Sequence, residues 1–464
     1  MKTRIVQIFC VLNLLNFSQS GRLRRNLDFQ LLKELQSTPF LLKDGLNNFN
    51  NAIFEQVSES TNGNTVISPF SIHTALTMAL LGAPTESKTY KELAAVLFNN
   101  SEEFKKEYLI NYLKVISFYD VQGSDVKIKL GNKAYALKDI SIKADYLDIL
   151  RNFFKSSVER VDFARGEETA AKINEFVSEK TNGKIKDLVS PESFSQDTRF
   201  LLINAMYFKG DWKIKFDKDL TKPMQFNIDS QTKIEYPFGM RLEKEDLKTA
   251  DLTDSKFPAK VLELPYGNKQ FSMLLILPEK GQNIQNLNLN HLNTQEINQK
   301  LVKSQVNAVL PRFKIEYETS MRDNLEKLNV RDIFDIARAN LSDIADAGLY
   351  VADVIHKAVI EVNEEGSEAA AATAVQIDTR LREPEKRKVN LTFDRPFLFV
   401  IHDNKHKIPL FMGRLVDPSG LNELKKCVQD GGNPGKNISF ECSNVTTKPQ
   451  QKTQPNNVPN RTNG

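Results

Sequence analysis

The chain has 464 residues, of which 40% are hydrophobic and 26% are charged, and its formal net charge is +4. This composition indicates a folded globular protein with one large domain or two to three smaller ones, and it excludes a chain that is mostly membrane-embedded or mostly disordered. A net charge this small gives no support for nucleic acid as a partner.

Residues 1–20 have the pattern of a secretory signal peptide. Lys2 and Arg4 precede a mostly apolar run from Ile5 to Phe17, and small residues stand just before Gly21. These are the charged, apolar and cleavage regions of such a signal, and the apolar run is too short to span a bilayer. We therefore expect a secreted, extracellular protein without a membrane anchor.

A basic N-terminal arm over residues 21–40 precedes the first periodic segment, in which apolar residues recur at helical spacing from Leu42 to Val57. A short strand over 65–67 then leads to Ser68 and Pro69, a serine cap followed by a proline that starts a helix. The uninterrupted apolar run from Phe200 to Phe208 predicts a strand in the middle of a large sheet covered on both faces. Further strands are expected at Val126–Tyr135, Lys260–Leu264, Phe271–Leu277, Gln305–Pro311, Ala358–Val362, Phe397–His402 and Leu410–Leu415. Further helices are expected within Lys172–Leu188, ending at Asn182-Gly183, and at Asn290–Leu301 and Met321–Leu328. This mixture of strands and helices, without a strict alternation, indicates an α+β domain.

Residues 421–464 are rich in Asn, Gln, Pro, Thr and Lys, which predicts a disordered tail. Cys10 leaves with the signal peptide, so the mature chain keeps only Cys427 and Cys442, which can form a disulfide in an oxidising compartment. Glycosylation sequons, each implying an exposed position if used, occur at Asn99, Asn340, Asn390, Asn437, Asn444 and Asn460. Three of them make the tail a candidate for glycosylation.

Motifs for catalysis or metal binding are absent from the sequence. It has no HExxH, GxSxG, phosphate-binding glycine loop or paired CxxC, and its five histidines do not form a recognisable ligand set. A dispersed catalytic triad would leave no local motif, so an enzyme stays as an alternative without positive support.

Several short motifs, in order along the chain, resemble those of the serpins, and the resemblance covers residues 41–420. They are Asn64 with Ser68-Pro69-Phe70-Ser71, Lys172-Ile173-Asn174, Asn204 with Lys209-Gly210-Asp211-Trp212, His356-Lys357-Ala358, Glu364-Glu365-Gly366, Arg395-Pro396-Phe397 and Phe411-Met412-Gly413-Arg414. The resemblance implies a fold of three β-sheets with eight to nine helices. It also implies an exposed, mobile reactive loop over about residues 364–393.

The hinge of that loop would be Glu364, Glu365, Gly366, Ser367, Glu368, Ala369, Ala370, Ala371, Ala372 and Thr373. Taken alone, the stretch could be a short helix capped by Ser367, although it has little apolar surface to pack. As a strand inserted into a sheet, it would turn Ser367, Ala369, Ala371 and Thr373 to one face, and none of these is bulky or charged. This composition favours insertion after cleavage, the inhibitory mechanism that the resemblance implies.

The resemblance places the bait residue fourteen positions after Gly366, which makes Arg380-Leu381 the expected reactive bond. Arginine there suits a trypsin-like or thrombin-like serine protease, whose primary pocket holds a carboxylate. The alternative bond is Arg382-Glu383. The charged segment from Glu383 to Lys388 is longer than in antitrypsin-like relatives, and it is either a solvated linker or an exosite.

The resemblance also implies a buried polar cluster, called a shutter, beneath the main sheet. It would contain Asn64, Ser68, Ser71, Asn204 and His356, while Trp212 would pack where the loop first inserts. The alternatives are that His356 and Trp212 are ordinary core residues.

Glycosaminoglycan binding could use two sets of lysines, which otherwise are simply solvated charges. They are Lys105, Lys106 and Lys114, and Lys213, Lys215 and Lys218.

Two functions follow from the resemblance. The first is a secreted, monomeric serpin that traps a trypsin-like protease covalently, with glycosaminoglycan as an optional accelerator. The second is a non-inhibitory serpin that acts as a carrier, storage protein or chaperone.

Overall fold

A computed structural model describes residues 42–98, 106–120, 125–267, 269–282, 284, 289, 292, 294–366 and 387–420. Within these residues the chain forms eight α-helices and two hydrogen-bonded sheets. The helices are α3 (Leu42–Glu59), α4 (Pro69–Leu80), α5 (Lys88–Leu97), α6 (Lys106–Asp120), α7 (Ala144–Ile149), α8 (Gly166–Lys180), α9 (Thr294–Lys300) and α10 (Arg322–Lys327).

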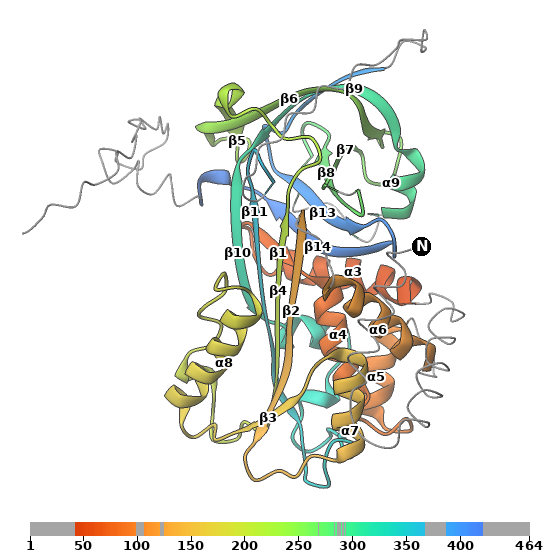
Figure 1. Cartoon of the computed structure of the whole chain (residues 1–464), viewed down its shortest axis with the longest axis vertical. Helices are drawn as coiled ribbons and strands as arrows, with labels where there is room; N and C mark the ends of the chain where they lie inside the picture. Colours follow the sequence, from red (N-terminus) through yellow and green to blue (C-terminus); the bar gives the residue numbers. More distant parts are fainter. Residues whose placement is uncertain are drawn as a thin grey trace, which may run out of the picture.

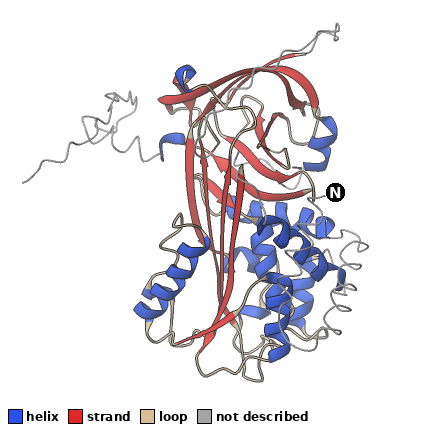
Figure 2. Ribbon diagram, in the orientation of Figure 1, coloured by secondary structure: helices blue, strands red, loops and turns tan. Residues whose placement is uncertain are grey.

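The five-stranded sheet runs along the long axis of the molecule, in the order β10-β11-β4-β2-β3 (Figure 1). Its strands are β2 (Val126–Leu137), β3 (Val158–Val161), β4 (Phe200–Gly210), β10 (Phe313–Ser320) and β11 (Val351–Val362). Helix α8 covers one face, and α3, α4 and α6 lie on the other (Figure 2). Central strand β4 is therefore buried on both sides, as its unbroken apolar sequence predicts.

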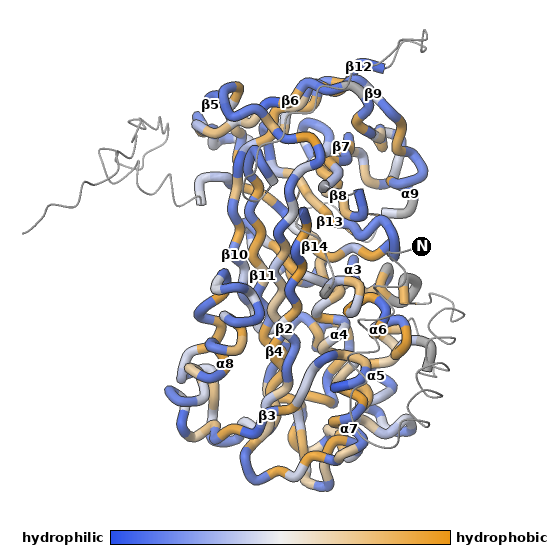
Figure 3. Tube along the Cα trace, in the orientation of Figure 1, coloured by the Kyte–Doolittle hydropathy of each residue, from blue (hydrophilic) through white to orange (hydrophobic). Residues whose placement is uncertain are grey.

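The core divides according to the two faces of this sheet. Ile173 and Val177 of α8 pack with Leu201 and Ile203 of β4 in a smaller cluster, while the alternate residues of β4 belong to the main core with α3 and α4. Figure 3 shows hydrophobic residues recurring along these central strands. Because side chains alternate along a strand, one apolar run can supply both clusters.

The nine-stranded sheet lies mostly above the helices in Figure 1 and runs β1-β14-β13-β8-β7-β6-β9-β12, with β5 pairing with β6. Its strands are β1 (Thr65–Ile67), β5 (Lys222–Asn227), β6 (Lys233–Asp251), β7 (Ala259–Pro265), β8 (Phe271–Pro278), β9 (Val302–Pro311), β12 (Lys388–Thr392), β13 (Phe397–Asp403) and β14 (Ile408–Leu415). The 19-residue strand β6 pairs with β5, β7 and β9. The resemblance implies three sheets, but continuous pairing through β6 joins these nine strands into one, so the described residues form two.

Helix α4 forms where the sequence places it. The hydroxyl of Ser68 accepts the amide of Ser71 at 3.3 Å, and Pro69 occupies the first turn, where it loses no intrahelical hydrogen bond. Every residue of the helix is buried. This explains a sequence that is apolar on most faces.

Several element boundaries differ from the expectations. The helix expected to end at Asn182-Gly183 begins earlier than Lys172, at Gly166, and its end at Lys180 agrees with the expectation, since Asn182 and Gly183 have positive φ angles of 54° and 71°. The strand expected at Gln305–Pro311 begins earlier, at Val302, directly after α9. Strand β6 was not expected, because Pro237 and Gly239 interrupt its alternation at an irregularity in its pairing with β5.

Candidate reactive-loop hinge and sheet opening

The chain reverses direction directly after β11, in a turn closed by a bridge between Asn363 and Gly366. Gly366 has a φ of 101°, which side-chain-bearing residues rarely adopt. A Cβ placed there would lie 2.5 Å from the Trp212 nitrogen and 2.8 Å from the Asp211 Cα, and still closer to the Gly210 carbonyl oxygen. Only glycine fits at this position, where the turn packs on the end of β4.

Trp212 holds this turn in place. Its indole Nε1 donates to the Asn363 carbonyl at 2.9 Å, and its backbone amide donates to the Glu365 carbonyl at 2.9 Å. The buried indole stacks on Tyr266, with ring centroids 4.4 Å apart and an interplanar angle of 14°. Trp212 therefore contacts the start of the hinge, as expected from the sequence.

Glu364 is anchored by two side-chain contacts. Its Oε1 accepts from the Arg312 guanidinium and from the Thr221 hydroxyl, each at 2.7 Å, and the residue is 2% exposed. Burial acts to raise the pKa of this carboxyl, but the hydrogen bonds from Arg312 and Thr221 outweigh it and hold the pKa below its usual range. Neighbouring Glu365 pairs with Lys218 at 2.5 Å.

The whole hinge is expected from the sequence to be mobile, whereas its first three residues, Glu364 to Gly366, are fixed by these contacts. Ser367 to Thr373, the reactive bond Arg380-Leu381 and the alternative bait Arg382 lie outside the described residues. The other end of the expected loop, from Lys388 to Thr392, forms strand β12, which pairs in parallel with β9.

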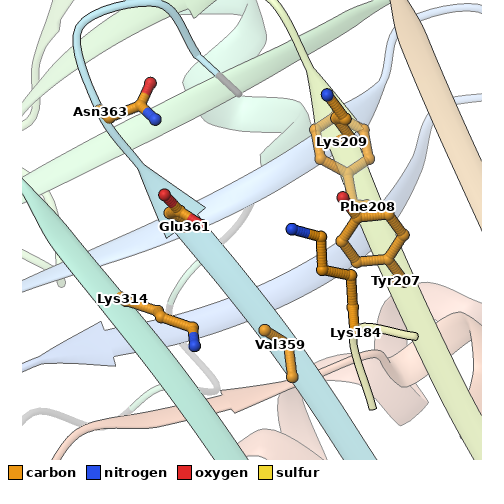
Figure 4. Close-up of a pocket in the computed structure, with 8 residues that line it drawn as sticks. All are labelled: Lys184, Tyr207, Phe208, Lys209, Lys314, Val359, Glu361 and Asn363. Carbon is orange, nitrogen blue, oxygen red and sulfur yellow. The ribbon is translucent and has the colours of Figure 1, made fainter. Parts of the chain in front are cut away.

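The central strands β4 and β11 are paired along most of their length but not at the ends near Gly366. Strands β4 and β11 are parallel, and their pairing begins at Phe200 and Val351 and ends at Tyr207 and Val359. Beyond that point lies a cavity of about 80 Å³, shown in Figure 4. It is lined by Lys184, Tyr207, Phe208, Lys209, Lys314, Val359, Glu361 and Asn363. We call the β4–β11 pairing the seam; it opens toward the turn that ends at Gly366.

A buried polar cluster crosses the seam lower down. His356 of β11 is in register with Asn204 of β4, and the imidazole Nδ1 is hydrogen-bonded to the Asn204 side-chain oxygen. The Asn204 amide donates to the Ser71 hydroxyl and to Asn132 Oδ1, both at 2.6 Å. These groups form one network that joins α4 to three strands or their flanks: Ser68, Ser71, Asn132, Asn204 and His356.

The contacts of His356 define its protonation state. Its Nε2 accepts the Ser68 backbone amide at 3.1 Å, so Nδ1 carries the proton that is donated to Asn204. Burial lowers the pKa of His356 to about 3. The imidazole is therefore neutral at physiological pH, with both nitrogens hydrogen-bonded.

Comparison with known proteins places this geometry in a family. The family model for Serpin (serine protease inhibitor) matches residues 44–418. The chain belongs to the serpin family. It is 36% identical over 384 residues to Iris of Ixodes ricinus, covering 81% of this chain and 98% of Iris.

Two further comparisons agree with this assignment. Serine protease inhibitor 42Dd of Drosophila melanogaster is 36% identical over 371 residues, covering 79% of this chain and 95% of the relative. The crystal structure of Serpin48 of Tenebrio molitor superposes with a TM-score of 0.69 at 27% identity, covering 83% of this chain and 98% of that chain. The expected α+β serpin fold is confirmed. Serpins named as serine protease inhibitors are not enzymes, so the enzyme alternative is set aside.

One member of the expected polar cluster lies elsewhere in this serpin, and one was missed. Asn64 Oδ1 accepts the backbone amides of Val416 and Asp417 at 2.7 and 2.9 Å, and its amide donates to the Asp417 carbonyl. The assignment of Asn64 to the cluster is thus corrected. Asn132 takes part instead, because it is in register with Asn204 across β2 and β4. A polar residue within the predicted strand at Val126–Tyr135 was the available signal.

Some of the remaining predicted sites lie within the described residues and others lie outside them. Asn340 and Asn390 are exposed, as a used sequon requires. Lys114 is half-buried, and burial lowers its pKa, while Lys213 and Lys215 are exposed. The sites outside the described residues, or without a described side chain, are Asn99, Lys105, Lys106, Cys427, Asn437, Cys442, Asn444 and Asn460.

The described part of the chain contains neither a candidate membrane span nor a candidate metal cluster. It contains no helix that is both long and apolar enough to cross a bilayer. Among the same residues, no three or more His, Cys, Asp or Glu side chains are grouped so that they could hold a metal ion.

Proposed function

We propose that this serpin is a secreted inhibitor of an arginine-specific, trypsin-like serine protease, and that it traps the protease by inserting its cleaved loop into the seam. The observation that carries the proposal is the position of Gly366. The turn that ends there is fixed on the end of β4, beside the opening of the seam. The hinge residues that follow thus begin next to the gap that they would enter.

The reaction would start as ordinary proteolysis. The Oγ of the protease serine attacks the carbonyl carbon of Arg380, and the protease's general base takes the hydroxyl proton. The bond to the Leu381 nitrogen breaks, and the proton passes to this leaving amine. An ester then links Arg380 to the protease until water hydrolyses it.

Insertion would compete with that hydrolysis. Because the chain reverses between Asn363 and Gly366, a strand that enters the seam would run antiparallel to both β4 and β11 and could bond to each of them. The fourteen residues from Ser367 to Arg380 are enough to follow β11, which has 12 residues. Some ten new hydrogen bonds at roughly 1 kcal/mol each would contribute on the order of 10 kcal/mol.

Insertion also requires the polar cluster to change partners. The hydrogen bond between His356 and Asn204 crosses the seam, so it must break when a strand separates β4 from β11. Both side chains are buried, and each needs a new partner on the inserted strand or on α4. We therefore retain the shutter role as a proposal for Ser68, Ser71, Asn204 and His356, and add Asn132.

The test is a denaturing gel of the mature chain mixed with trypsin and with a thrombin-like protease. We expect an SDS-stable complex and a released fragment whose first residue is Leu381. Arg380→Ala should abolish the complex, and the matched variant Arg382→Ala should retain it. A fragment that begins at Glu383, with the opposite response of the two variants, would move the reactive bond to Arg382.

Cleavage without any stable complex would instead support the non-inhibitory alternative, a carrier, storage protein or chaperone. Chymotrypsin and elastase serve as control proteases, and neither should form the complex.

Secretion, a monomeric state and glycosaminoglycan acceleration are separate proposals. N-terminal sequencing of the exported protein should begin at Gly21, and gel filtration should give one chain per particle. Heparin would raise the rate of complex formation at low ionic strength and lose this effect in high salt, since ion pairs are screened.

A further inference from the structure

A second cavity lies away from the seam, between three connections of the nine-stranded sheet. This cleft, of about 650 Å³, is formed by the β5–β6 turn, the end of β8 with the residues after it, and the segment before β13, with Val416 just after β14. We call it the side cleft. Its size falls within the range of roughly 300–1,000 Å³ of small-molecule sites in proteins.

The wall of the side cleft contains an apolar surface assembled from separate segments. Ile284 is 6% exposed and Pro278 is buried, whereas Ile228, Pro396 and Val416 are half-buried and present apolar area to the cleft. Such surface favours an apolar body that can be removed from water. The cleft could therefore hold the hydrocarbon or aromatic part of a ligand.

Hydrogen bonds between the segments of this wall hold them in place. The Asn64 side chain positions Val416 through the contact of 2.7 Å described above. Arg395 donates to the Pro278 carbonyl from Nε at 3.1 Å and from a terminal nitrogen at 2.8 Å. Asn227 donates to the Asp394 carbonyl from both its backbone and its side-chain amide. The shape of the cleft is thus largely formed before any ligand binds.

The acidic groups of the cleft are already engaged. Asp394 pairs with Arg395 at 2.9 Å. Asp229 accepts the backbone amides of Gln231 and Thr232, both at 2.7 Å, and these two hydrogen bonds hold the pKa of its carboxyl below the usual range. Asp394 is thus neutralised by Arg395, whereas Asp229 keeps its negative charge at the exposed β5–β6 turn.

The two lysines of the cleft lack such contacts. Lys233 and Lys280 are exposed, and neither has an ion pair or side-chain hydrogen bond within the part of the chain that the structure describes. They come from different segments, the start of β6 and the turn after β8. Positive charge is therefore available beside an apolar wall.

We propose that the side cleft binds a small amphipathic organic anion, with its apolar body on the wall and its carboxylate or sulfonate paired with Lys233 and Lys280. The cleft uses neither the seam nor the hinge, so the proposal stands independently of protease inhibition. The lining carries three positive side chains (Lys233, Lys280 and Arg395) against two negative ones (Asp229 and Asp394), so an ammonium ligand should bind more weakly than an anion of the same shape.

The experiment uses the mature chain and two fluorescent probes of similar shape. One is 8-anilinonaphthalene-1-sulfonate, and the other is the uncharged N-phenyl-1-naphthylamine, which lacks the sulfonate. We expect saturable binding of the anionic probe near one per chain, and at least a tenfold loss of its affinity in the double variant Lys233→Gln, Lys280→Gln. Lys91→Gln, an exposed lysine of α5 outside the cleft, is the matched control and should bind like the parent protein.

Three results would overturn the proposal. They are no saturable binding of the anionic probe, unchanged affinity in the double variant, or an equal loss for both probes, which would indicate a collapsed cleft. Melting curves of each variant establish that the binding measurements refer to folded protein.

Discussion

The Nδ1 proton of His356 is held by the side-chain oxygen of Asn204, across the one pairing that loop insertion would separate. Hydrogen bonds inside a dry core gain strength from the low dielectric, but a group left without a partner there carries the full cost of desolvation. The network therefore stabilises the closed seam, and any opening that breaks the His356–Asn204 hydrogen bond has to give both side chains new partners.

Replacing Asn132 by alanine should lower the free energy of unfolding by about 2–4 kcal/mol, because the Asn204 amide and the Ser71 hydroxyl each lose a buried acceptor. Asn390→Ala is the matched control, since that asparagine is exposed on β12 and its loss should change stability by less than about 0.5 kcal/mol. Urea unfolding measures both. If both variants lost the same free energy of unfolding, burial in the cluster would not determine the size of that loss.

Acid should weaken the fold through its buried histidines. Burial lowers the pKa of His356 to about 3 and that of His73 to about 4, whereas both rise toward 6.5 on unfolding. Between these values the unfolded state binds more protons, so stability falls as the pH drops below 6.5. From pH 6.5 to 5 the loss is about 2 kcal/mol for each histidine.

The variant His356→Gln isolates one of these contributions. It should be less stable than the parent at pH 7.5, yet lose about 2 kcal/mol less between pH 6.5 and 5 in urea titrations. An unchanged pH dependence would mean that His356 is not the neutral, buried group described here.

Substitution of Gly366 tests the packing of the turn on β4. Gly366→Ala adds both an unfavourable φ and a clash with the Trp212 backbone, so it should cost more than Gly183→Ala, where φ is 71° but no atom lies within 4 Å. The backbone strain alone is about 1 kcal/mol. Gly348→Ala, with open space and no positive φ, should be close to neutral. A thermal melt that ranks the three otherwise would contradict the close contact.

Removal of Arg312 should destabilise the start of the hinge. In Arg312→Met the buried carboxylate of Glu364 loses its guanidinium partner and keeps the hydrogen bond from the Thr221 hydroxyl, and the expected loss at pH 7 is about 2–4 kcal/mol. Part of this loss should disappear below about pH 4, because the lowered pKa of Glu364 stabilises the parent only above that range. The exposed Arg160→Met of β3 is the control. Similar unfolding midpoints for the two variants would argue against the ion pair.

Local sequence chemistry accounts for much of the fold. The cap at Ser68, the proline at the start of α4 and the apolar run of β4 each act over a few residues, and all three predict what the structure contains. Strand β6 was missed because its irregularity and its charged, exposed positions hide the alternation. Its assignment depends on pairing with three strands: β5 and β7 are its neighbours in sequence, whereas β9 begins only at Val302.

The sequence by itself determined that this chain is a serpin, and it supplied the glycine at position 366 and the small residues after it. Only the tertiary structure decided which polar side chains meet. Asn132 and Asn204 are 72 positions apart and face each other through strand register, while Asn64, close to Ser68 in sequence, turns instead to Val416 and Asp417. Register is a property of strands that have already paired, so no local pattern contains it.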